Sequence, residues 1–158
     1  MTDGIFQVAA AVEPDWVDYN GHLNMAYYHV MFDRALDRAL DHFAVGPGYA
    51  PKSPWTVFTA EVHVRYLAEV LPAARLRVDI LALAVDDKRL HTFQMLRDAA
   101  TGRLHATSEQ MLLHVGLETR KVSPFPADAR ARLETWVAES LAAPRPEGIG
   151  RSIAMPKR

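Results

Sequence analysis

One long amphipathic helix followed by an unbroken run of strand-like segments is the feature that most restricts how this chain folds. From Asn24 to Phe43, apolar side chains recur at helical spacing while charged side chains occupy the other positions. Asn24, or Asn20 just upstream, is expected to cap this helix, and the Gly46-Pro47-Gly48 cluster is expected to end it. The apolar stripe must be buried against another element, which the following strands can supply.

Strand periodicity replaces helical periodicity after that cluster. Strands are predicted after the cluster near residues 56–67, 74–86, 89–98 and 103–116, and a short strand is predicted before the helix at residues 5–12. Short connections at Ala73-Ala74, Asp86-Asp87-Lys88 and Ala100-Thr101-Gly102 predict hairpins, so we expect the strands to run antiparallel as a meander. The order of strand, long helix and antiparallel strands predicts an α+β fold in which a sheet covers the central helix.

The first long strand shows a clear alternation in the segment VFTAEVHVRY. Strict alternation gives one face to Phe58, Ala60, Val62, Val64 and Tyr66 and the other face to Thr59, Glu61, His63 and Arg65. A second helix is predicted from about 126 to 142, followed by a peripheral tail rich in Pro and Gly. We expect one domain over residues 1–143 and a tail over residues 144–158.

Composition excludes several classes of protein. Eighteen Lys and Arg against nineteen Asp and Glu give a formal charge of −1, so we expect neither a nucleic-acid partner nor attraction to an anionic membrane. The absence of cysteine removes thiol nucleophiles, disulfides and cysteine-based zinc sites. No signal peptide or long apolar run is recognisable, so we expect a cytoplasmic protein.

Known catalytic and cofactor motifs are also missing from the sequence. The seven histidines form no H-E-x-x-H pattern, so no metal site is expected. Without a G-x-S-x-G motif or a Gly-rich phosphate loop, the α/β-hydrolase, P-loop and Rossmann classes are not supported.

The loop that leads into the long helix gathers most of the reactive side chains. It contains Asp18 as a candidate base or nucleophile, Asn20 and Asn24 to orient groups or water, and His22 to hold the loop or move a proton. The free N–H groups at a helix start can stabilise negative charge on a carbonyl oxygen. Asp, Asn and Gly in this position are also what capping and turn formation alone would select.

The stretch D-Y-N-G-H-L-N-M-A-Y-Y followed by a long amphipathic helix resembles hot-dog thioesterases. It resembles in particular the 4-hydroxybenzoyl-CoA thioesterase-like group and its acyl-carrier-protein relatives, over roughly residues 5 to 125. The resemblance implies a hot-dog fold, with Asp18 as general base or nucleophile and the N–H near Met25 polarising the thioester carbonyl. It also places Asn20 and His22 at functional positions.

Residues 86–93 and 106–115 look more specifically like the thioesterase domains associated with carnitine dehydrogenases, which act on betainyl-CoA. For such a substrate, Trp16, Tyr19 and Tyr27 are candidates for an aromatic wall that contacts a quaternary ammonium. The same rings also fit an ordinary core or interface.

Four more residues are candidates for substrate binding. Glu61 is placed to line a site across a subunit interface, and Arg65, Lys88 and Arg89 are suited to the phosphates of coenzyme A. A solvated hairpin or an exposed strand face explains them equally well.

Together these features predict an acyl-CoA thioesterase that acts on a small or medium acyl group, with coenzyme A as part of the substrate and no separate cofactor. A sheet with an open face and edge predicts a homodimer or homotetramer. An enoyl-CoA hydratase or dehydratase of the same fold, or a non-catalytic acyl-CoA-binding protein, remains an alternative.

Overall fold

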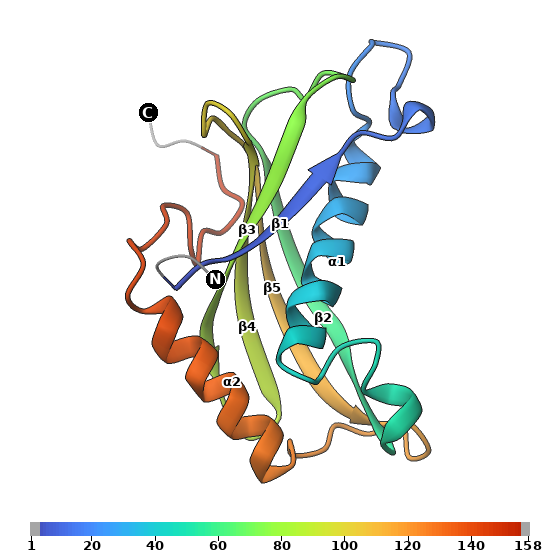
Figure 1. The fold of residues 1–158 in the computed structure, drawn as a ribbon, viewed down its shortest axis with the longest axis vertical. Coiled ribbons are helices and arrows are strands. Elements are labelled where there is room, and N and C mark those ends of the chain that lie inside the picture. The colour runs from blue at the N-terminus through green and yellow to red at the C-terminus, as the bar shows by residue number, and fades with distance from the viewer. Residues whose placement is uncertain (1–3, 156–158) are drawn as a thin grey trace.

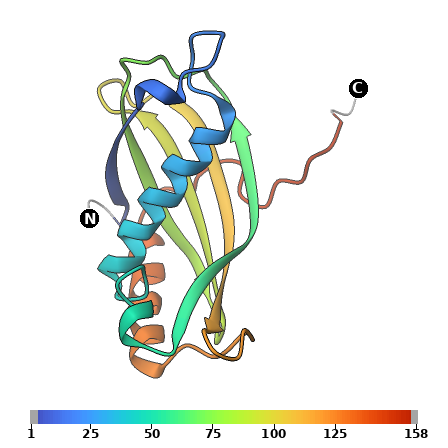
Figure 2. The same cartoon turned by 90° about the vertical axis from the view of Figure 1, so that its right-hand side faces the viewer.

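The computed structural model describes residues 4–155, which form one five-stranded antiparallel sheet and two α-helices. The strands are β1 (Phe6–Ala11), β2 (Trp55–Tyr66), β3 (Arg75–Val85), β4 (Arg89–Asp98) and β5 (Leu104–Gly116). The helices are α1 (Met25–His42) and α2 (Ala127–Ser140), with short 3₁₀ turns η1 (Pro14–Trp16) and η2 (Ala50–Lys52). The sheet curves around α1, which confirms the predicted α+β hot-dog architecture (Figures 1 and 2).

The strand order is β1-β3-β4-β5-β2, so the predicted meander is correct only for β3, β4 and β5. The hairpin expected at Ala73-Ala74 is wrong, because β2 pairs with β5 at the opposite side of the sheet from β1. The connection between β2 and β3 instead crosses the end of the sheet. Its residue Val70 is fully buried in the core, and its carbonyl accepts a hydrogen bond from Leu23 N–H at 2.9 Å, which ties the crossing to the start of α1.

A β-bulge breaks the alternation predicted for β2. Thr59 lies opposite Leu112, whereas Glu61 lies opposite Met111, and these two neighbours on β5 face opposite sides of the sheet. The prediction that Thr59 and Glu61 share a face is therefore wrong. The extra residue, Ala60, shifts the register of β2 against β5. A strict alternation of two residues cannot predict such a shift.

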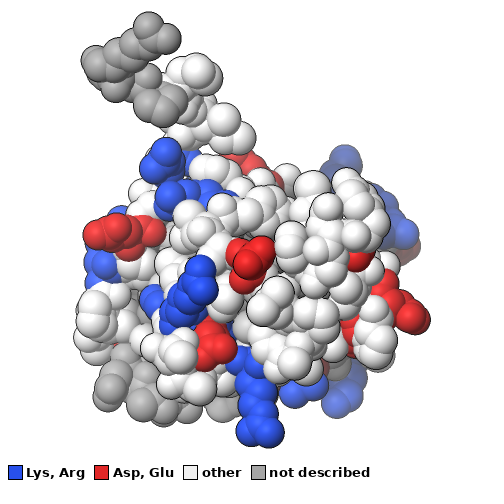
Figure 3. Space-filling view, turned by 90° about the horizontal axis from the view of Figure 1, so that it is seen from above, with Lys and Arg blue, Asp and Glu red and all other residues white. Residues whose placement is uncertain are grey.

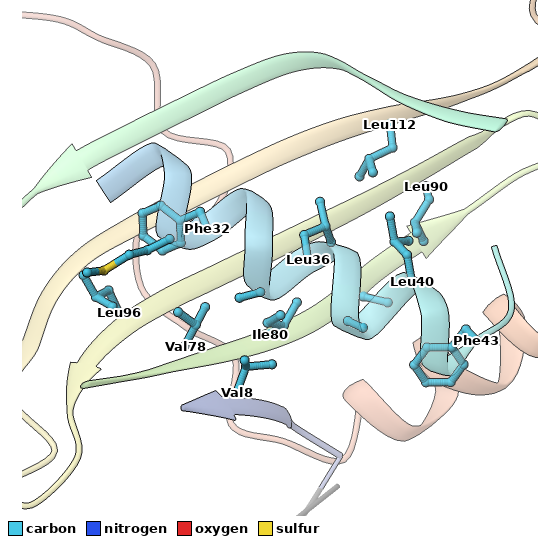
Figure 4. Close-up of a cluster of buried hydrophobic side chains, with 14 of the residues drawn as sticks. Val8, Phe32, Leu36, Leu40, Phe43, Val78, Ile80, Leu90, Leu96 and Leu112 are labelled. Carbon is cyan, nitrogen blue, oxygen red and sulfur yellow. The ribbon is translucent and has the colours of Figure 1, made fainter. Parts of the chain in front are cut away.

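The main core lies between α1 and the sheet. Figure 4 shows Phe32, Leu36 and Leu40 of α1 directed toward the inner sheet face. The buried sheet residues drawn against them include Val8, Val78, Ile80, Leu90, Leu96 and Leu112. Burying each large aliphatic or aromatic side chain contributes roughly 1.5–3 kcal/mol, so this contact is the main stabilising layer.

The second helix packs along β3, where Ser140 Oγ accepts a hydrogen bond from Ala82 N–H at 3.0 Å. Beyond α2, Ile149 packs against a small cluster on the outer sheet face formed by Leu81, Phe93 and Met95. Residues 1–3 of the expected domain and 156–158 of the expected tail lie outside the described residues. Neither described helix is long and apolar enough to cross a membrane.

His114 is a structural histidine at the end of the core opposite the start of α1. Its side chain is fully buried among Trp55, Phe125 and Tyr49, with Nδ1 at 2.9 Å from the Ser123 carbonyl and Nε2 at 3.2 Å from the Tyr49 hydroxyl. The carbonyl requires a proton on Nδ1, and in the neutral ring Nε2 then accepts from the Tyr49 hydroxyl. Burial lowers the pKa of His114.

This lowered pKa predicts a loss of stability in mild acid. The unfolded chain binds a proton at His114 more readily than the folded chain, so the free energy of unfolding falls as the pH drops below the ordinary histidine pKa. The slope for one proton is at most about 1.4 kcal/mol per pH unit. Urea unfolding at several pH values between 7.5 and 5 should show a smaller pH dependence in His114→Phe than in the wild type, and equal slopes would contradict the assignment.

Candidate functional site

The loop before α1 is closed by backbone hydrogen bonds that hold Asp18 next to the helix start. Val17 and Leu23 form an antiparallel bridge, and Asp18 N–H donates to the His22 carbonyl at 2.9 Å. The turn inside the bridge needs Gly21, whose φ of 80° lies in the left-handed region. The loop is therefore a short, defined hairpin.

The Asp18 carboxylate has one bonded and one open oxygen. Oδ1 accepts a hydrogen bond from Asn20 N–H at 2.8 Å, which is the turn-forming contact expected of an aspartate here. Within residues 4–155, Oδ2 makes no hydrogen bond. The side chain is partly buried, so its turn contact leaves an oxygen for a substrate or water.

The helix start presents one backbone donor. Asn24 caps α1 as predicted: its Oδ1 accepts from Ala26 N–H at 2.9 Å, and its carbonyl accepts from Tyr27 N–H at 3.0 Å. Met25 is the first helical residue, so its N–H has no acceptor within the helix. At the positive end of the helix dipole, this N–H is suited to bind a carbonyl oxygen that gains negative charge.

The other two loop residues predicted to act in catalysis, His22 and Asn20, differ in their side-chain contacts. His22 Nε2 lies 3.2 Å from Glu69 Oε2, so it links the loop to the β2–β3 connection. Asn20 is exposed at the loop tip, where its backbone rather than its side chain contacts Asp18. The catalytic roles of both residues remain predictions.

A hollow of about 370 Å³ lies beside the helix start. It is lined by His22, Leu23, Met25, Tyr28, Tyr66, Leu67, Ala68 and Glu69. The rings of Tyr28 and Tyr66 meet edge to face, with centroids 5.2 Å apart, and the Tyr66 hydroxyl donates to the Met25 carbonyl at 3.3 Å. Burial raises the pKa of Tyr28, and the charges of Glu69 and Asp18 contribute to that shift.

Of the three aromatic residues expected to form a wall, the structure brings Trp16 and Tyr27 together and leaves Tyr19 apart. Trp16 is buried and stacks on Tyr27 at 5.2 Å, while Arg34 lies 4.9 Å from the centre of the Trp16 ring. The cation–π contact of Trp16 is thus made by a residue of the chain itself. Tyr19 is 97% exposed at the loop tip, so the three rings do not line one surface.

The remaining candidate residues lie away from the helix start in this chain. Glu61 lines a hollow on the outer sheet face together with His63, His91 and Glu109. Arg65 packs closely against Gly148 of the tail. The structure therefore does not bring either residue to the Asp18 loop.

Lys88 and Arg89 lie on the hairpin between β3 and β4, at the opposite end of the sheet from the start of α1 (Figure 1). Arg89 pairs with Asp86 at 2.6 Å, and its hydrogen bonds lower the pKa of Asp86 to about 2. Both cationic side chains border a hollow with Leu113 and Val122. Within one chain they are separated from Asp18.

Sequence reasoning missed the part of the site contributed by β2 and the connection after it. The sequence pattern marks Tyr66 only as a strand residue and contains no signal for Glu69. Figure 3 views the end of the molecule that carries the start of α1 and shows acidic and basic side chains interspersed among other residues. Within residues 4–155, no group of three or more His, Asp or Glu side chains is arranged so that it could hold a metal ion.

Most of the chain matches a known protein family. Residues 12–133 match the Thioesterase-like superfamily. This chain belongs to that superfamily. It is a thioester hydrolase, as its family and its curated relatives indicate. Of the three predicted functions, the thioesterase is therefore favoured over the hydratase and the non-catalytic binding protein.

Two curated relatives have informative names. The chain is 41% identical to betainyl-CoA thioesterase of Pseudomonas aeruginosa over 145 residues, covering 92% of this chain and 91% of that protein. It is 34% identical to L-carnitine dehydrogenase/betainyl-CoA thioesterase of Rhizobium meliloti over 146 residues, covering 92% of this chain and 29% of that longer protein.

Two solved structures share the fold over almost the whole chain. A Staphylococcus aureus protein in complex with CoA has a TM-score of 0.90 and 26% identity, with 99% of this chain and 98% of that chain covered. A putative thioesterase from Pseudomonas putida has a TM-score of 0.81 and 37% identity, with 95% and 96% covered.

The capping geometry predicts that Asn24→Ala destabilises the protein. Loss of the acceptor for Ala26 N–H should cost about 1 kcal/mol, within the usual range for N-cap substitutions. Urea unfolding would measure the change, with Asn20→Ala as the matched control because the Asn20 side chain is exposed at the loop tip. An equal loss of stability in both variants would contradict a specific capping role.

Proposed function

We propose that this thioesterase hydrolyses a small acyl-CoA, with Asp18 as general base or nucleophile and Met25 N–H as the donor to the carbonyl oxygen. The observation that carries this proposal is the closed hairpin, which holds a carboxylate with an open oxygen in the loop that leads directly into a helix-start N–H without an acceptor in the helix. Asn20 and His22 would support the position of the loop and of water.

The chemistry requires little beyond these groups. As general base, Asp18 would take a proton from a water whose oxygen attacks the carbonyl carbon; as nucleophile, its oxygen would attack that carbon and form an anhydride that water then hydrolyses. In both routes the carbon–sulfur bond breaks, and the products are a carboxylate and the thiol of coenzyme A. Met25 N–H would stabilise the negative charge on the carbonyl oxygen in each attack.

We propose betainyl-CoA as the substrate. The names of the Pseudomonas aeruginosa and Rhizobium meliloti relatives support this choice, and the first of them matches over 91% of its own length. The likeness to a structure solved in complex with CoA supports coenzyme A as the leaving group.

Asp18→Asn should lower kcat by about 10²–10⁴-fold and change KM much less, because an amide neither accepts the proton nor attacks the thioester. Thiol release from betainyl-CoA would measure both constants. Asp15→Asn is the matched control, since Asp15 is an exposed aspartate in η1 outside the hairpin. Near-normal turnover in Asp18→Asn would overturn the role of Asp18.

We further propose a homodimer formed through the outer edge of β2. This strand is twelve residues long, lies at the sheet edge and exposes Phe58. Antiparallel pairing of two such edges by a twofold axis would reverse one copy. The Lys88–Arg89 hairpin of one copy would then lie at the same end as the Asp18 loop of the other, where its cations can meet the phosphates of coenzyme A.

Lys88→Ala should raise KM for the acyl-CoA roughly three- to fivefold with little change in kcat, because an exposed phosphate contact contributes to binding rather than to bond breaking. Lys121→Ala, the same change in an exposed residue outside the strands and helices, is the control. Steady-state kinetics would measure both variants, and sedimentation would measure the dimer. Equal KM values for wild type and Lys88→Ala would remove Lys88 from the binding site.

A further inference from the structure

We infer that Tyr28, Tyr66 and Glu69 form the subsite that recognises the positive charge of the acyl group. This inference rests on the proposed function, and it assigns residues to a specificity that the names of the relatives do not explain. The three side chains share one hollow beside the start of α1.

The position of the hollow suits a short cationic acyl group. The ammonium nitrogen of a betainyl group is only two bonds, each roughly 1.5 Å long, from its carbonyl carbon. If Met25 N–H holds the carbonyl oxygen, the ammonium must therefore lie against the first turn of α1. Tyr28 is three residues after Met25 and on the same side of the helix, and Tyr66 reaches the Met25 carbonyl with its hydroxyl.

The chemistry of the lining suits a methylated ammonium, which has no N–H to donate. Tyr66 is 47% exposed, so part of its ring is accessible, while the buried Tyr28 packs edge to face with it. An aromatic face attracts such a cation without needing a hydrogen bond. The hydroxyls of both tyrosines are directed to backbone carbonyls, those of Ala68 and Met25.

Charge at the hollow decides between a cationic and a neutral acyl group. The helix start is the positive end of the α1 dipole, and His22 adds a second group that can carry positive charge, so a cation here needs negative groups nearby. Glu69 supplies a carboxylate on the hollow, with Oε2 3.2 Å from His22 Nε2, and the negative charge of Asp18 in the hairpin also acts on Tyr28. Trp16 and Tyr27 are less suited, because Arg34 already covers the Trp16 ring.

The test compares betainyl-CoA with 3,3-dimethylbutanoyl-CoA, in which carbon replaces the charged nitrogen and the shape is kept. The wild type should prefer the charged ester by about 10–100-fold in kcat/KM. Tyr66→Leu and Glu69→Gln should each reduce this preference about three- to tenfold, chiefly by slowing the charged ester. Tyr66→Phe keeps the ring and should keep the preference, and Glu118→Gln is the control for the same loss of charge on an exposed turn.

The outcomes separate this inference from the function on which it rests. Turnover of the neutral ester by Tyr66→Leu shows that the variant is folded, and a reduced preference then supports the subsite. Equal preferences in wild type, Tyr66→Leu and Glu69→Gln would overturn the subsite while leaving the thioesterase reaction in place. Failure of the wild type to release thiol from either ester would overturn the proposed substrate instead.

Discussion

The packing of α1 against the curved sheet is the contact on which the rest of the structure depends. An eighteen-residue helix with a charged outer face gains most of its stability from tertiary burial rather than from helix propensity. Phe32, Leu36 and Leu40 provide that burial against β3, β4 and β5. Because the core holds the helix axis in place, the direction in which its first N–H groups point is fixed as well.

The same core fixes the site through a few backbone contacts. Val70 is buried at the end of the sheet, and its carbonyl accepts a hydrogen bond from Leu23 N–H. Asn24 N–H donates to the Trp16 carbonyl, and the Val17–Leu23 bridge closes the hairpin that carries Asp18. The carboxylate and the helix-start N–H are thus held by two segments that are each attached to the core, which is the kind of rigid support that a reacting geometry requires.

Local sequence patterns predicted what depends on neighbours along the chain. The apolar spacing of α1 and the cap at Asn24 are both local properties, and both are confirmed. The position of β2 is not predictable in this way, because its pairing with β5 rather than β3 is a contact between segments far apart in the sequence. The bulge at Ala60 and the contact of Arg34 with Trp16 likewise depend on packing between distant segments.

The site shows the same division between local and distant information. Asp18, Asn24 and Met25 come from one continuous segment, so a motif is enough to find them. Tyr66 and Glu69 join them only because β2 runs to the end of the sheet beneath the helix start and the chain then crosses it. The groups proposed for thioester chemistry therefore lie in the hairpin and the helix start, whereas the groups proposed to distinguish one acyl charge from another come from the end of β2 and the crossing that follows it. In such an arrangement, selectivity can change through Tyr66 and Glu69 while the hairpin and the reaction it supports stay the same.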